Sequence, residues 1–179
     1  RVVLAETAHI TVKKALRLLG FGMNHLHYAP VDQYGRIDPA RLPELDERTL
    51  LILQAGEVNT GEFDRFAELI AIVREANAWV HVDGAFGLFA RVSEQLRPLT
   101  EGIELADSWA TDGHKWLQTP FDTGYAIVRD AEAHQRAMTT WASYLPQRGP
   151  DERIPSSLVP ELSRRARGLA TWAVLKSLG

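Results

Sequence analysis

The 179-residue sequence predicts an α/β fold, with a mostly parallel sheet flanked by helices. Short apolar runs alternate with segments of helical periodicity in the order β-α-β-α-β-α-β, which is typical of this class. The run 50–54 is apolar up to its last residue, as expected of a strand covered on both faces. Polar residues follow several predicted strands, and ligands bind beyond the carboxyl ends of strands in such sheets.

The first part of the chain contains three predicted strands and two predicted helices. The elements expected are, in order, a strand at 2–5, a helix at 7–19, a strand at 23–29, a turn at 33–36, a short helix at 38–45 and a strand at 50–54. Thr7 is expected to cap the first helix and Gly20 to close it. Asp38 followed by Pro39 combines a cap with a favoured first helical residue, so it predicts the start of the second helix.

The second part continues the alternation. The elements expected are a loop at 56–61, a helix from Phe63 to about Asn77, a strand at 79–82 ending at Asp83, a flexible continuation at 84–87, strands at 107–111 and 124–128, a helix at 130–140, an irregular proline-rich loop at 144–160 and a final helix beginning near Leu162. Apolar residues at helical spacing mark the helices. No internal repeat or low-complexity tract interrupts the pattern.

The amino-acid composition excludes several classes of function. Hydrophobic residues make up 45% and charged residues 24%, with 20 Lys+Arg against 23 Asp+Glu, so the chain is globular and lacks the basic field that a nucleic-acid partner requires. The absence of cysteine excludes disulfides, thiolate zinc sites and a cysteine nucleophile, and it fits the reducing cytoplasm that we expect as location. No apolar run reaches the roughly 18 residues of a membrane span.

One of the four lysines lies in an unusual place. Three of them have ordinary surface positions on predicted helices: Lys13, Lys14 and Lys176. Lys115 instead follows a strand, between His114 and Trp116. A lysine beside bulky apolar groups can lose its proton and form a Schiff base with an aldehyde. The alternative is a lysine at a strand edge with its amine in solvent.

Two further residues at strand ends have more than one interpretation. Asp83 ends a predicted strand, and a buried carboxylate there must be paired. Its partner could be a protonated pyridine nitrogen; the alternatives are a cap of the next segment or a metal ligand. His9 opens a helix and could stack on a flat cofactor ring, or it could be an ordinary polar residue of a first helical turn.

Metal sites and common nucleotide motifs are not predicted. His25 and His27 share one predicted strand face, as do His81 and Asp83, but neither pair has a third ligand at a useful spacing. The sequence contains no G-x-G-x-x-G, no P-loop and no G-x-S-x-G.

Four segments together carry a family resemblance. These are HVDGAFG at 81–87, DSWATDGHKWL at 107–117, GEVNTGEFD at 56–64 and SRRARGLATWAVLKSLG at 163–179. Their sequence resembles the pyridoxal-phosphate-dependent group II amino-acid decarboxylases, which have fold type I with the aspartate-aminotransferase architecture. The resemblance implies that 1–179 is an internal piece, the central part of the large cofactor-binding domain. The main phosphate-binding loop would then precede Arg1, the small C-terminal domain would follow Gly179, and the whole protein would be a homodimer.

The resemblance also implies roles around the cofactor ring. Lys115 would form the Schiff base with pyridoxal 5'-phosphate, and Asp83 would pair with the pyridinium nitrogen. His9 would stack on one ring face and help to position the substrate, while Ala85 would pack on the opposite face.

Further roles are implied nearer the phosphate. His114 would lie close to the phosphate, and Asp112 stands where the family often has Asp or Asn. The family often has Gly-Thr-Thr at 56–58, where this chain has Gly-Glu-Val, so Asn59 or Thr60 would serve instead.

The implied reaction is decarboxylation of an L-amino acid by a carboxy-lyase. An aromatic substrate is favoured, with diaminobutyrate or glutamate as alternatives. Many family members carry a tyrosine on a loop before the final helix, but none lies between Gln147 and Glu161, and Tyr144 is the nearest. Other pyridoxal-phosphate chemistry therefore stays open: an oxidative deaminase or aldehyde synthase, an aldehyde lyase, an aminotransferase, or a catalytically silent piece.

Overall fold

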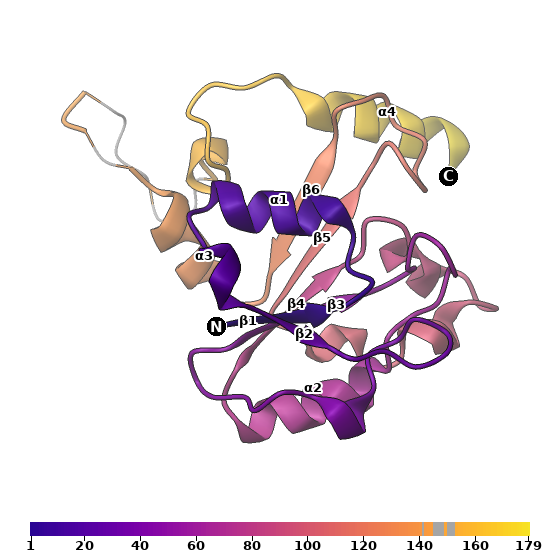
Figure 1. Cartoon of the computed structure of the whole chain (residues 1–179). Helices are drawn as coiled ribbons and strands as arrows, with labels where there is room; N and C mark the ends of the chain where they lie inside the picture. Colours follow the sequence, from indigo (N-terminus) through magenta and orange to yellow (C-terminus); the bar gives the residue numbers. More distant parts are fainter. Residues whose placement is uncertain (141, 145–148, 150–152) are drawn as a thin grey trace.

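The computed structural model describes residues 1–140, 142–144, 149 and 153–179, and contains one six-stranded sheet of order β2-β1-β3-β4-β5-β6 (Figure 1). The strands are β1 Val2–Ala5, β2 Leu26–Ala29, β3 Leu50–Gln54, β4 Trp79–Asp83, β5 Ser108–Asp112 and β6 Gly124–Val128. Neighbouring strands pair in parallel, except that β6 runs antiparallel to β5. The predicted α/β class with a mostly parallel sheet is confirmed.

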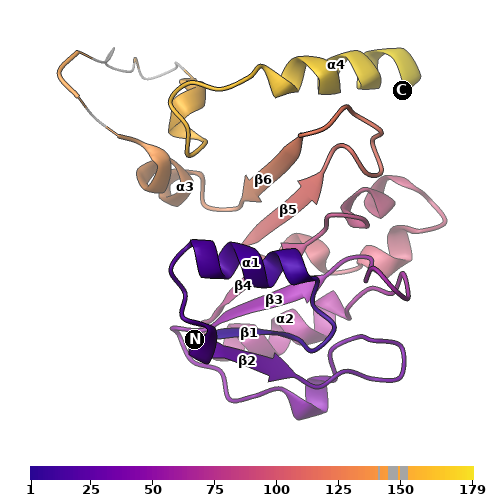
Figure 2. The same cartoon turned by 45° about the horizontal axis from the view of Figure 1, so that its top comes forward.

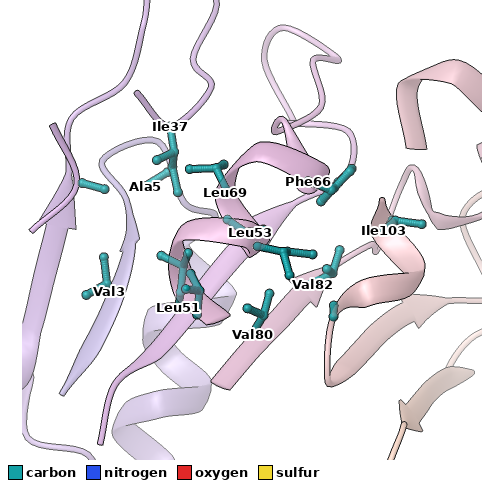
Figure 3. Packing of buried hydrophobic residues seen from close by; sticks show 14 of the residues in the cluster. Val3, Ala5, Ile37, Leu51, Leu53, Phe66, Leu69, Val80, Val82 and Ile103 are labelled. Carbon is teal, nitrogen blue, oxygen red and sulfur yellow. The ribbon is translucent and has the colours of Figure 1, made fainter. Parts of the chain in front are cut away.

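Helices cover both faces of the first strands. The helices are α1 Ile10–Leu18, α2 Phe66–Glu75, α3 Ala131–Met138 and α4 Arg167–Leu178. Figures 1 and 2 show α1 and α2 on opposite sides of the sheet. Val2 and Leu4 belong to the apolar cluster that contains Leu16 of α1. Leu51 and Leu53 instead join the cluster of α2, in which Phe66, Leu69 and Val82 are also buried (Figure 3). The continuous apolar runs are therefore explained by burial on both faces.

The first helix begins later than predicted. Its cap is His9, whose side chain accepts a hydrogen bond from the backbone N–H of Thr11. The Thr7 hydroxyl, the predicted cap, instead donates to the Gly35 carbonyl at 3.1 Å. Thr7 therefore connects the turn before α1 to the turn at 32–36. The prediction that Thr7 caps the helix was wrong, because the distant Gly35 carbonyl accepts its hydroxyl.

The predicted elements at 23–29 and 38–45 are shorter than expected. A 3₁₀ turn, Met23–His25, precedes β2, so His25 does not share a strand face with His27. The second helix is reduced to the 3₁₀ turn Pro39–Arg41, although Asp38 caps it by accepting from Ala40 N at 3.1 Å. Pro43 follows at once, and a proline lacks the N–H that would continue a helix.

Later elements also differ from their predicted limits. Phe63 forms an isolated bridge with Ala55, so α2 starts three residues after the predicted Phe63. Between β4 and β5, where the sequence predicts only the continuation at 84–87, the chain forms three short 3₁₀ turns: Leu88–Val92, Arg97–Thr100 and Ile103–Leu105. The final helix begins at Arg167 instead of near Leu162. Part of the predicted loop at 144–160 lies outside the described residues.

The last helix lies beside the antiparallel strand pair (Figure 2). Thr171 of α4 hydrogen-bonds to the hydroxyl of Tyr125 on β6, and Arg167 Nε lies 3.1 Å from the Asp122 carboxylate. These polar contacts join α4 to β6 and to the loop that precedes it. Among the helices that the structure describes, none has the length and apolar character needed to cross a bilayer.

Candidate active site

A cavity of about 470 Å³ lies between α1 and the strands β3, β4 and β5. Alternate residues of a strand face the same side, so every second residue of these strands reaches it, with Thr111 as one additional lining residue. The lining residues of the strands are Leu50, Ile52, Gln54, Trp79, His81, Asp83, Ser108, Ala110, Thr111 and Asp112. Five of the eight predicted site residues line this one cavity: His9, Asp83, Ala85, Asp112 and Lys115. The parallel topology explains their convergence, because they follow or end neighbouring strands at the same sheet edge.

The ammonium group of Lys115 has two partners in the cavity. Its Nζ lies 2.9 Å from Oδ2 of Asp112 and 4.3 Å from the centre of the Phe86 ring. The lysine side chain is 26% exposed and the aspartate side chain 30%, so both are partly desolvated. Lys115 is therefore held inside the cavity and does not extend along the outer surface.

The carboxylate of Asp83 faces the cavity with little to neutralise it. Its Oδ1 accepts a hydrogen bond from the backbone N–H of Ala85 at 3.1 Å. Within the described ranges, no lysine, arginine or histidine forms an ion pair with it. A partly buried anion without a cationic partner is suited to bind a protonated nitrogen of a ligand.

A chain of three polar side chains crosses the same face of the sheet. The indole Nε1 of Trp79 donates to Oγ of Ser108 at 2.9 Å, and this oxygen lies 2.8 Å from Nδ1 of His81. An indole N–H can only donate, so the serine proton is free to point at the imidazole. Burial lowers the pKa of His81, although the negative charge of Asp83 acts in the opposite direction. The lowered pKa favours the neutral imidazole, and Nδ1 as acceptor is the tautomer that fits the indole donor.

His9 reaches the cavity from the start of α1. Its Nδ1 lies 2.7 Å from the hydroxyl of Thr11 and accepts from the Thr11 backbone N–H at 3.4 Å. Capping therefore fixes one edge of the imidazole, and the helix start places the ring at the cavity wall. The capping contact gives His9 an ordinary structural role, and its stacking on a cofactor ring stays a prediction.

Asn59 and Thr60 have a different environment from the other candidates, and neither lines the cavity. Their backbone N–H groups each lie 2.8 Å from Oε2 of Glu57, and their side chains bond to the same carboxylate. Burial would raise the pKa of Glu57, but these four hydrogen bonds outweigh it and lower the pKa. The loop at 56–62 is consequently organised around a buried carboxylate, with Gly56 and Val58 in the cavity lining.

His114 lies just outside the cavity lining, beside Lys115. Its ring stacks on Phe121 at 4.3 Å between centroids, and its Nε2 is 3.7 Å from Asp112 Oδ2. In the described part of the chain, two buried side-chain polar atoms lack a hydrogen-bond partner, Nδ1 of His114 and Oγ1 of Thr119. Buried polar groups are usually paired, so these orphan atoms indicate a place for a polar ligand group.

Gly113 directly precedes His114, and its backbone lies close to the side chain of Thr119. A Cβ added there would lie 2.6 Å from Oγ1 of Thr119 and 2.9 Å from the hydroxyl of Tyr125. A side chain at this position would collide with Thr119 and Tyr125, so glycine is needed for their close approach to the backbone beside Thr119 Oγ1.

Several lining residues were not predicted as site residues from the sequence. Phe86, Trp79 and Ser108 were treated only as parts of strands or loops, although alternation from Asp83 and Asp112 would have placed the last two on the same face. Among the described residues, no group of three or more histidines and acids is arranged to hold a metal ion.

Comparisons with known proteins agree on one family. The model of the pyridoxal-dependent decarboxylase conserved domain matches residues 1–179. An aromatic-L-amino-acid decarboxylase of Bacillus atrophaeus is 29% identical over 99% of this chain and 39% of its own length. An L-2,4-diaminobutyrate decarboxylase of Acinetobacter baumannii is 28% identical over 100% of this chain and 37% of its length.

A solved structure supports the fold. The Oryza sativa TDC crystal structure with PLP and tryptamine superposes with a TM-score of 0.88 at 26% identity, covering 99% of this chain and 39% of that one. The chain thus spans well under half the length of these relatives.

Proposed function

The chain belongs to the pyridoxal-dependent decarboxylase family, and from this premise we propose that its cavity binds pyridoxal 5'-phosphate and that the whole protein decarboxylates an L-amino acid. The observation that carries the proposal is the presence of Lys115 and Asp83 in one cavity at the carboxyl edge of the sheet. An amine to attach an aldehyde and an unpaired carboxylate to hold a protonated ring nitrogen are the two groups that this cofactor requires.

The residues around this pair also fit the cofactor. Nδ1 of His114 and Oγ1 of Thr119 are buried and unpartnered, as expected of groups that meet phosphate oxygens. Gly113 lets the backbone approach Thr119 Oγ1 closely, and a side chain there would displace this atom. The methyl side chain of Ala85 lines the cavity and leaves room for a planar ring.

Each residue would have a distinct task. Lys115 would supply the amine that attaches to the cofactor aldehyde, and Asp83 would hold a proton on the ring nitrogen. His9 and Ala85 would pack against the cofactor ring, while His114 would bind the phosphate. When bound, the cofactor serves as a sink for the electron pair left at the amino-acid α-carbon. The apolar lining from α1 and the sheet excludes water from this side of the site.

We favour an aromatic substrate for a reason of charge. A diaminobutyrate side chain would need an anion for its second ammonium group, but the carboxylates of the described lining are Asp83 and Asp112. The first is assigned to the ring nitrogen, and the second is already paired with Lys115. A relative named as an aromatic-amino-acid decarboxylase supports the same choice.

We also propose that the whole protein is a homodimer. Leu169 and Trp172 of α4 are large apolar residues that are 66% and 62% exposed. Exposed apolar surface of this kind is typical of a contact surface. Light scattering of the full-length protein tests this: twice the chain mass is expected, and a monomer would contradict it.

Product analysis tests the proposed reaction. Full-length protein with pyridoxal phosphate would be assayed against a panel of L-amino acids, and CO₂ with the matching amine is expected, most rapidly from an aromatic substrate. Ammonia with an aldehyde would instead indicate an oxidative deaminase or aldehyde synthase. Turnover of diaminobutyrate or glutamate in preference to aromatic amino acids would refute the assigned substrate class.

A further inference from the structure

We infer that Asp112 and Phe86 form a holding site for the protonated amine of Lys115, and that Asp112 is a positioning residue for the lysine and does not bind phosphate. The inference rests on the proposed function and deepens it, because it identifies where the lysine goes when it is not attached to cofactor. It also replaces the role near the phosphate that the family resemblance implies for Asp112.

The geometry around Nζ is suited to an ammonium group. An ammonium has three donors and no acceptor, whereas a carboxylate only accepts. The 2.9 Å contact between Nζ and Asp112 Oδ2 is a charge-assisted hydrogen bond at its usual length. On another side, the Phe86 ring centre lies 4.3 Å from Nζ, within the range of a cation–π contact. A neutral amine would gain much less from either partner.

The position of Phe86 is fixed by its backbone surroundings. The next residue, Gly87, donates its N–H to the Ala55 carbonyl at 2.9 Å. Gly56 has a φ of 84°, and a Cβ on it would lie 3.1 Å from Cβ of Phe86. The loop that begins at Gly56 therefore packs closely against Phe86, while the Phe86 side chain stays 44% exposed and lines the cavity.

Charge argues against a phosphate contact for Asp112. An ionised carboxylate has no proton to donate to a phosphate oxygen, and two anions in contact repel each other. The unpartnered atoms of His114 and Thr119 offer better partners for the phosphate. This leaves the Asp112 carboxylate with Lys115 as its nearer partner at 2.9 Å, while Nε2 of His114 lies farther away at 3.7 Å.

The holding site explains how the lysine is kept clear during substrate exchange. The substrate nitrogen would gain a bond to the aldehyde carbon of the cofactor, and the Lys115 nitrogen would lose its bond to that carbon. The lysine would then leave as a free amine. The proton that the incoming substrate ammonium gives up is the proton that Lys115 takes. As an ammonium, Lys115 would then bind Asp112 and Phe86, and it must return that proton before it can attack again.

The test measures the reactivity of each lysine, because only an unprotonated amine is acylated. The whole chain without cofactor is treated with an amine-acylating ester at about pH 8, and peptide mass spectrometry gives a rate for every lysine. Asp112→Asn should raise the rate at Lys115 roughly fivefold, and Phe86→Leu roughly twofold. Asp112→Glu should return the rate towards that of the parent chain.

Lys13 is the matched internal control, because it lies over the Tyr28 ring at 4.8 Å and has no carboxylate partner in the described residues. Its rate should not change in any variant. An unchanged rate at Lys115 in Asp112→Asn, or an equal rise at all lysines, overturns the inference. If Asp112→Asn does not fold, Phe86→Leu decides alone: a twofold rise at Lys115 supports the holding site, and no rise overturns it.

A second measurement separates this inference from the proposed function. The ratio of the dissociation constants for pyridoxal and pyridoxal phosphate should be the same in Asp112→Asn and in the parent chain. A ratio that shifts in favour of the phosphate form would show that Asp112 acts on the phosphate, and would refute the inference. If the acylation contrast is found but the full-length protein binds no cofactor, the holding site stands and the proposed function fails.

Discussion

The buried carboxylate of Asp64 predicts an unusual pH dependence of stability. Asp64 is 4% exposed, and it accepts hydrogen bonds from the backbone N–H groups of Gln54 at 2.7 Å and Ile37 at 2.8 Å. It thereby fixes the 30–38 segment to the end of β3, directly beside the cavity. Burial raises the pKa of Asp64 from 3.8 to about 6, because desolvation outweighs the two hydrogen bonds.

The sign and size of the effect follow from linkage. Because the pKa of Asp64 is higher in the folded chain than in the unfolded chain, its stabilising effect is complete below 3.8 and is lost as pH rises through about 6. At about 1.4 kcal/mol per pH unit, the whole interval corresponds to about 3 kcal/mol. About 2 kcal/mol of this falls between roughly pH 4.5 and 7.5.

Urea unfolding followed by tryptophan fluorescence measures this effect. Asp64→Asn removes the titratable carboxyl group but leaves one backbone N–H facing the NH₂ group of the asparagine, which cannot accept a hydrogen bond. This costs about 1–3 kcal/mol at every pH. The stability advantage of the parent chain over the variant should therefore be larger at about pH 4.5 than at about pH 7.5, by about 2 kcal/mol. A difference below about 0.5 kcal/mol, or one of opposite sign, would refute the reasoning.

Three other substitutions test the surroundings of the site. Glu57→Gln should lower the free energy of unfolding by about 1–3 kcal/mol, since an amide cannot accept all four hydrogen bonds. Urea titration measures this loss, and a loss below about 0.5 kcal/mol would contradict the prediction. The lowered pKa of Glu57 means that its stabilising effect is present above 4.5 and lost as pH falls through the lowered value. Gly113→Ala should weaken pyridoxal phosphate binding, because its Cβ would lie 2.6 Å from Thr119 Oγ1. Gly124→Ala is the control and should not weaken binding, because its Cβ would have no neighbour nearer than 3.8 Å in the described part of the chain. Equal effects of the two substitutions in a fluorescence titration would argue against a phosphate site beside Thr119. Asp83→Asn should lower activity about a hundredfold or more while changing unfolding by less than about 1 kcal/mol, and comparable losses in both would favour a purely structural carboxylate.

The strands could be predicted from sequence because their signals are local. Leu50–Gln54 is a strand with the predicted bounds, and Val2–Ala5 likewise, since continuous apolar runs leave few alternatives. The helix expected after Pro39 failed because Pro43 limits it to one turn. The cap at Thr7 failed because its hydroxyl bonds to Gly35, a partner 28 residues away that no local pattern reveals.

The site shows the same division between local and distant signals. Lys115 and Asp83 stand out in the sequence because strand ends of a parallel sheet converge, and both line one cavity. The partners of Asn59 and Thr60 could not be predicted, because Glu57 is an acid whose burial depends on how the loop closes around it. Likewise, the contact between the Phe86 ring and the Lys115 amine could not be predicted, because the two residues are distant in the sequence and meet only in the folded structure.

Reductive trapping tests the central claim, that Lys115 is the amine that binds the cofactor. The full-length protein would be incubated with pyridoxal phosphate, reduced with borohydride and digested, and the pyridoxyl group would be located by mass spectrometry. We expect modification at Lys115, together with loss of the visible absorption band in Lys115→Ala. Modification at Lys13, Lys14 or Lys176 in place of Lys115, or a band that survives the substitution, would contradict it.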